Sequence, residues 1–239
     1  MIVKLRNPAL LLYFLSYIMY LFFFKIYADK EIALIFKPMI VTSISFYYFF
    51  YNEKKVEDYK GKLHFVILLL LFIADNMALM LEEIFNFWAL FIYLVVLILL
   101  FYILLVDSKL LERKQKKLQY VKAGLFSVFA FSVVAKIISV YWLTKSFSSY
   151  YNILAYIVLA IGVLVLGFYN FLKNKTTSSK FLLITFLSLF GSDILYVLYK
   201  YYTQNTLWLY LSCAVEIPCY YLLVRYFISR DNEKRLTIQ

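Results

Sequence analysis

Eight long apolar stretches, separated by short polar segments, constrain this chain more than any other feature of its sequence. The stretches cover residues 8–25, 31–52, 63–81, 86–107, 121–143, 150–172, 179–201 and 206–229. As a helix rising about 1.5 Å per residue, each can cross the roughly 30 Å hydrocarbon core of a bilayer. Because 64% of the side chains are hydrophobic, a water-soluble domain of this length could not bury them. We therefore predict an all-α, polytopic transmembrane bundle of eight helices, forming a single domain over residues 1–239.

The basic residues follow the alternation that sets orientation in a membrane. Eighteen Lys and Arg residues lie at the two termini and in the second, fourth and sixth loops, against four in the odd-numbered loops. Because segments rich in Lys and Arg stay on the cytoplasmic side, the pattern predicts that both termini are cytoplasmic. The net charge of +11 is explained by these loops, so we expect no nucleic-acid partner. We expect a multi-pass protein of a bacterial inner membrane.

Ionisable side chains also occur inside the predicted spans, where burying a charge is costly and is commonly tied to function. Arg225 falls near the inner face, where its long side chain can reach the interface. Helical rise places the other five about 9–15 Å below the outer boundary. These five are Lys37, Asp75, Lys136, Asp193 and Glu216. Five charges at similar depth on five helices predict one polar pocket beneath the outer surface.

Two aspartates are the candidate catalytic residues of this pocket. Asp75 and Asp193 are too short to reach the interface, and a pair of carboxyl groups suits general acid and base catalysis. They lie 118 residues apart on helices that run in the same direction, which favours two parallel halves of four helices. The expected substrate-binding or pKa-adjusting residues are Lys37, Asn76, Lys136, Ser192 and Glu216. The simpler alternatives are lysines that reach the outer interface and an Asp–Lys pair that is purely structural.

Neither a metal nor another cofactor is expected. His64 is the only histidine, and we expect it at the membrane interface, at the inner end of the third stretch. Cys213 and Cys219 are six residues apart, so they do not share a helix face, and we expect both to be buried as small apolar residues. A histidine-based metal site or catalytic triad needs a cluster that these residues do not supply.

Short motifs in a fixed order support a resemblance to a known family. The motifs are Phe36-Lys37-Pro38, Ile73-Ala74-Asp75-Asn76, Phe190-Gly191-Ser192-Asp193 and the closing segment Pro218-Cys219-Tyr220-Tyr221-Leu222-Leu223. In this order the chain resembles the YhhN-like family of membrane proteins, which includes the lysoplasmalogenases. The family has Lys-Pro in helix two, Gly-Asp in helix three and Ser-Asp in helix seven. Ala74 stands where the family has Gly, and the range 86–107 lacks the family's frequent His.

The resemblance implies about eight helices and a lipid substrate. It predicts hydrolysis of the vinyl ether bond of a lysoplasmalogen, a lysophospholipid, to a fatty aldehyde and a glycerophospho-alcohol. Protonating the β-carbon of a vinyl ether creates an oxocarbenium-like cation, which a carboxylate can stabilise before water attacks. Asp75 and Asp193 would divide these roles, and Lys37 would hold the lipid phosphate or adjust the pKa values of the aspartates.

Two further functions fit the same residues. Buried Asp and Lys side chains on several helices, with a repeat, also suit a proton-coupled transporter, although the spans contain few Gly or Pro interruptions. A membrane scaffold without catalytic activity is the third possibility. In that case, replacing both aspartates by asparagine would leave folding and phenotype intact.

Overall fold

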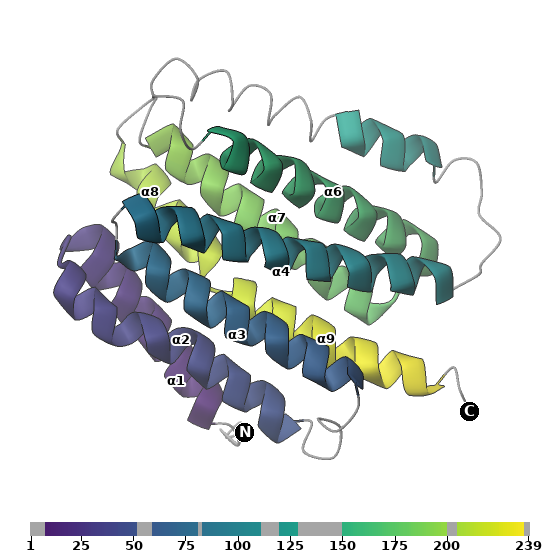
Figure 1. Ribbon diagram of the computed structural model, residues 1–239, viewed down its shortest axis with the longest axis horizontal. Helices are drawn as coiled ribbons and strands as arrows, with labels where there is room; N and C mark the ends of the chain where they lie inside the picture. The colour runs from purple at the N-terminus through teal and green to yellow at the C-terminus, as the bar shows by residue number, and fades with distance from the viewer. Residues whose placement is uncertain are drawn as a thin grey trace.

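The computed structural model describes residues 8–51, 59–80, 83–110, 120–128, 150–199 and 205–236 (Figure 1). Within these ranges the chain is helical and contains no strand, which confirms the predicted all-α bundle. Residues 120–128 form an unlabelled helix. The labelled elements are α1 (Pro8–Leu21), the π-helical turn η1 (Phe22–Ile26), α2 (Lys30–Tyr51), α3 (Tyr59–Leu79), α4 (Glu83–Leu110), α6 (Tyr150–Asn174), α7 (Thr177–Val197), α8 (Thr206–Glu216) and α9 (Cys219–Leu236).

Seven segments of the described chain are long and apolar enough to cross a membrane. They agree with seven of the eight predicted spans to within a few residues at most ends. The last of them, Thr206–Glu233, combines α8 with most of α9. The predicted span 121–143 lies mostly outside the described residues, and its described part is helical. The chain is therefore an integral, multi-pass membrane protein.

Helices α4 and α6 pack side by side and run in the same direction (Figure 1). Toward their first turns, the ring centroids of Tyr93 and Tyr156 lie 6.5 Å apart. Toward their last turns, Lys173 donates a hydrogen bond to the carbonyl of Ser108. A directly connected pair of spans would be antiparallel, so the chain returns to the other end of the bundle between α4 and α6. The shared direction of α4 and α6 supports the predicted crossing at 121–143.

Connections between helices define the two ends of the bundle. The outer end is named from the loop charges, and it holds the turn between η1 and α2, the end of α3, the start of α4 and the start of α8. The inner end holds the α6–α7 turn and the C-terminus of α9. Ala28 at the outer end and Lys175 at the inner end adopt positive φ angles of 57° and 50°. Asp29 then caps α2 by accepting a hydrogen bond from the N–H of Ile32 at 3.1 Å.

A buried polar cluster joins α9 to α3 and α4 at the inner end. Nε of Arg230 donates to both carboxylate oxygens of Asp107, at 2.7 and 3.0 Å, and the Tyr226 hydroxyl donates to the same group at 3.1 Å. The His64 ring stacks on Phe227, with 4.2 Å between their centroids. His64 lies at the inner end as expected, but it is fully buried rather than interfacial. Its ring nitrogens have partners inside the protein, which compensates for the loss of water.

Candidate functional site

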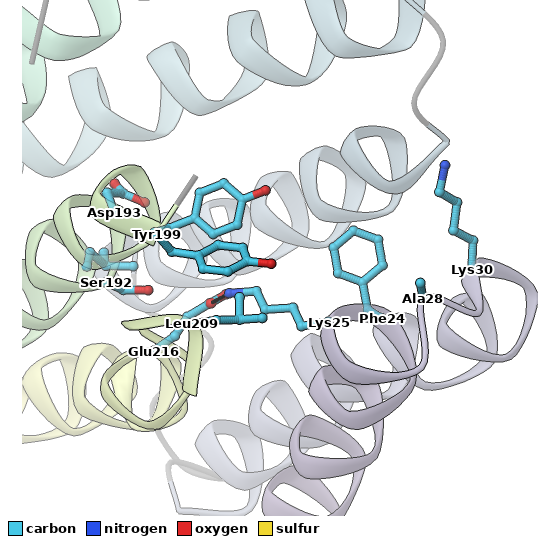
Figure 2. Close-up of a pocket in the computed structure, with 11 residues that line it drawn as sticks. Phe24, Lys25, Ala28, Lys30, Ser192, Asp193, Tyr199, Leu209 and Glu216 are labelled. Atoms are coloured by element: carbon cyan, nitrogen blue, oxygen red, sulfur yellow. Dashed lines mark hydrogen bonds and ion pairs between the residues drawn. The ribbon is translucent and has the colours of Figure 1, made fainter. Parts of the chain in front are cut away.

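A cavity of about 480 Å³ opens at the outer end, between η1, α7 and α8 (Figure 2). Its charged lining residues are Lys25, Lys30, Asp193 and Glu216, two of each sign. Aromatic side chains, Phe24, Tyr196 and Tyr199, form part of the same lining. Ligand sites of this kind combine apolar walls with a few convergent polar groups, and the volume suits a small molecule or a lipid head group.

An ion pair between Lys25 and Glu216 connects η1 to the end of α8. Nζ of Lys25 lies 3.0 Å from one carboxylate oxygen, and the Tyr17 hydroxyl donates to the other oxygen at 3.0 Å. Figure 2 shows the Lys25 side chain reaching Glu216 at the cavity wall. Lys25 is the last residue of the predicted stretch 8–25 and was counted among the four basic residues of the odd-numbered loops, but the structure extends the first span through Ile26. The residue lies in a π-helical turn, a distortion that often occurs at functional sites.

Glu216 stands where the last span is interrupted. It is the final residue of α8, and Ile217 and Pro218 form a turn before α9 begins. Pro218 has no N–H with which to continue the helical hydrogen bonds. The Tyr13 hydroxyl donates to the carbonyl of Ile217, which satisfies one polar group at this turn. The break therefore places a carboxylate at the end of a half-helix on the cavity wall.

Asp75 occupies a more enclosed polar cluster. Its side chain is 2% exposed, and it does not line the cavity. The hydroxyls of Tyr93 and Tyr220 donate to its two carboxylate oxygens, and Nζ of Lys37 lies 3.7 Å away. The same ammonium lies 4.4 Å from the centroid of the Tyr20 ring. Sequence analysis grouped Lys37 with Asp75 by depth alone, and the structure brings the two into one buried ion pair.

Tyrosine side chains connect the enclosed cluster to the cavity. The rings of Tyr17 and Tyr220 have centroids 6.3 Å apart. Tyr220 donates its hydrogen bond to Asp75, whereas Tyr17 donates to Glu216. A substitution of Asp75 can therefore alter the position of Glu216 through the packed rings of Tyr220 and Tyr17.

Asp193 lies on the cavity wall in α7 and is exposed there. It is within electrostatic range of both Glu216 and Lys25. Tyr156 of α6 is in turn within electrostatic range of Asp193 and Asp75. The structure thus gathers Asp75, Asp193, Lys37 and Glu216 in one polar region at the outer end.

The remaining predicted site residues make local contacts or lie outside the described chain. Ser192 lines the cavity, but its hydroxyl donates to the carbonyl of Ser212 at 3.0 Å and joins α7 to α8. Asn76 donates its amide to the carbonyl of Phe72 in its own helix at 2.6 Å. Lys136 lies outside the described residues. The catalytic and binding roles assigned to all of these residues stay predictions.

Sequence reasoning missed the tyrosines of the site. Tyr17, Tyr93 and Tyr220 hold the carboxylates, yet the chain has 24 tyrosines, and of these three only Tyr220 was named, as part of the closing motif and without a role. One available signal was the spacing in the first span. Tyr13, Tyr17 and Tyr20 recur at helical intervals and form a buried stripe on α1.

Comparisons with known proteins give no further guidance to the chemistry. The chain matches no protein-family model, no curated protein and no solved structure. Within the described residues, no three His, Cys, Asp or Glu side chains come together as a metal site.

Proposed function

We propose that this chain is a membrane hydrolase that cleaves the vinyl ether bond of a lysophospholipid by carboxyl acid–base catalysis. The observation that carries the proposal is the gathering of carboxylates from α3, α7 and α8 at one end of the bundle, beside lysines from η1 and α2. Charged groups are rare inside membranes and mark functional sites when they converge. The resemblance to the lysoplasmalogenases supports Asp75 and Asp193 as residues on which the reaction depends, whether by direct contact with the substrate or by positioning other groups.

The reaction needs one proton donor and one carboxylate. The donor protonates the β-carbon of the vinyl ether, and the neighbouring carbon becomes an oxocarbenium-like centre that a carboxylate stabilises. Water adds to that centre and gives one proton to the carboxylate. The resulting hemiacetal breaks its bond to the glyceryl oxygen as its hydroxyl becomes the aldehyde carbonyl, and the proton lost from that hydroxyl passes to the glyceryl oxygen, which leaves as the alcohol. The products are one fatty aldehyde and one glycerophospho-alcohol, and one water is consumed.

A single-chain lipid suits the position of the cavity. The mixed charges of the lining can meet a polar head group, while the single hydrocarbon chain stays among apolar side chains. If the basic loops are cytoplasmic, the cavity lies at the outer side of the membrane. We propose a bacterial inner membrane as the location of the protein, with its lipid substrate in the outer leaflet.

Aldehyde release from a lysoplasmalogen by the purified protein tests the proposal. We expect release by the wild type and a loss of about 10²-fold or more in Asp193→Asn. Glu31→Gln is the matched control, because Glu31 is an exposed carboxylate of α2 that does not line the cavity. A lysophospholipid with a saturated ether should remain intact. Wild-type protein that releases no more aldehyde than Asp193→Asn would contradict the proposal.

A transporter is the second candidate, and the break beside Glu216 favours it. Discontinuous helices often form the ion and substrate sites of transporters. Proteoliposomes with an imposed pH gradient separate the two functions. Collapse of the gradient on addition of lysophospholipid to proteoliposomes, but not to protein-free liposomes, and without aldehyde release would indicate coupled transport. Aldehyde release with an unchanged gradient would indicate hydrolysis.

A further inference from the structure

The carboxylates at the outer end differ in their access to the cavity. Asp193 and Glu216 both line it, and Glu216 has a side chain that is 24% exposed. Asp75 is 2% exposed and does not line it. Two tyrosine hydroxyls and one ammonium already face the oxygens of Asp75. Figure 2 shows Asp193 and Glu216 at the same side of the cavity, projecting from α7 and α8.

We infer that Glu216 is the second reacting carboxylate, that Asp193 is the proton donor, and that Asp75 is a positioning residue. This assignment rests on the proposed hydrolase function. Glu216 receives Lys25 on one oxygen and Tyr17 on the other, at 3.0 Å each, and both contacts stabilise and orient a negative charge. Such a group suits the stabilisation of a cation and the acceptance of a proton from water.

Asp193 has the surroundings of a donor. Within the described part of the chain, none of the ion pairs includes it, whereas Glu216 is paired with Lys25. Because both carboxyl groups line one cavity and only Glu216 is paired with an ammonium, Asp193 is the one better suited to hold a proton. Asp193 gives this proton to the β-carbon of the vinyl ether. Glu216 takes a proton from the attacking water, and transfer of that proton to Asp193 restores the starting state.

Asp75 acts on this pair through packed side chains. It fixes Tyr220, whose ring contacts Tyr17, and Tyr17 holds the carboxylate of Glu216. Lys37 balances the charge of Asp75 within the same enclosed cluster. The last span is interrupted directly after Glu216. This residue therefore stands at the end of α8, on the wall of the cavity.

Chemical labelling of the wild-type protein tests the assignment without any need for turnover. The detergent-solubilised chain is treated with a carbodiimide and an amine, and modified carboxyl groups are located by mass spectrometry. We expect amide formation at Asp193 with the added amine, amide formation at Glu216 with the added amine or with Nζ of Lys25, which lies 3.0 Å away, and protection of Asp75. A lysophospholipid with a saturated ether, which cannot be cleaved, should slow labelling of the first two residues. Labelling of Asp75 as fast as Glu216, or an inert Glu216, would overturn the inference.

Kinetics separate the reacting residues from the positioning residue. Asp193→Asn and Glu216→Gln should each lower kcat by about 10²-fold or more, and Glu216→Gln should remove the acidic limb of the pH profile of kcat. Asp75→Asn should keep both the acidic and the basic limb of the pH profile of kcat, and its kcat should fall by less than about tenfold. Glu31→Gln is the control. An Asp75→Asn protein that is folded but has lost a limb of the profile would contradict the positioning role.

The two proposals fail in distinguishable ways. If the wild type releases no aldehyde, the hydrolase function is wrong, whereas labelling and its protection by lipid still decide which carboxylates face the ligand. If the wild type is active but Glu216→Gln is equally active, the hydrolase stands and the assignment of Glu216 falls. Should Asp75→Asn fail to fold, labelling of the wild type still decides the outcome.

Discussion

Arg230 on α9 donates a hydrogen bond from its guanidinium to Nε2 of His64 on α3, at 3.2 Å. A guanidinium has no acceptor, so this nitrogen of His64 must present its lone pair. In a neutral imidazole the proton then resides on Nδ1, which lies 2.9 Å from the Tyr48 hydroxyl. One histidine thus connects α2, α3 and α9 at the inner end, far along the bundle from the cavity.

Replacing His64 should therefore weaken the inner end. We expect His64→Phe to lower stability by about 1–3 kcal/mol, because one buried N–H of Arg230 loses its acceptor. His64→Gln should lose less, since its side-chain carbonyl can still accept from Arg230. Thermal unfolding can be followed by the reactivity of Cys213 and Cys219, which are buried as free thiols. A His64→Phe protein as stable as the wild type would contradict this arrangement.

The Lys37–Asp75 pair should show strong coupling. Removing only the carboxylate, in Asp75→Asn, leaves a buried ammonium without its countercharge and should cost about 3–5 kcal/mol. The double variant Asp75→Asn, Lys37→Met should recover part of this loss, because it removes the uncompensated charge as well. The wild type, Asp75→Asn, Lys37→Met and the double variant form a double-mutant cycle, measured by the same cysteine-reactivity melts. Purely additive losses would show that the two side chains do not interact.

Lys175→Gly should stabilise the protein. Lys175 follows the end of α6 with a φ of 50°, a conformation that costs an L-residue with a Cβ about 1 kcal/mol and costs glycine nothing. Lys175→Ala is the matched control, because it removes the charge and keeps the Cβ. We expect a higher melting temperature for the glycine variant only. Equal melting temperatures for both variants would contradict the left-handed conformation.

Reporter fusions should place both termini on the cytoplasmic side. The described chain supplies seven candidate spans, and the parallel α4 and α6 require a further crossing between them. We expect a C-terminal green fluorescent protein to fluoresce and a phosphatase fused after Ala28 to be active outside. An active phosphatase at the C-terminus would remove the eighth crossing.

Much of the fold could be predicted because lipid imposes a simple rule. A chain that crosses the hydrocarbon core must satisfy its backbone hydrogen bonds within each span, so runs of about twenty apolar residues become helices. This is why the predicted stretches and the described helices agree. The alternation of basic loops likewise predicted an even number of spans, which the parallel α4 and α6 support.

The candidate site was only partly predictable. Depth along a helix placed Lys37, Asp75, Asp193 and Glu216 in one layer, and the structure gathers them there. Depth carries no information on helix rotation, so it could not distinguish the enclosed Asp75 from the cavity-lining Glu216. Lys25 was assigned to a loop because the π-helical continuation of the first span leaves no clear mark in the sequence.

By itself, the sequence determined that this is a helical membrane protein whose intramembrane charges are concentrated toward the outer end of the bundle. Only the tertiary structure decided which charges meet. Lys25 and Glu216 are 191 residues apart, and they form a pair because α1 packs where the last span breaks. Spans follow from the local hydrophobicity of the chain, whereas ion pairs depend on the rotation and packing of helices distant in sequence.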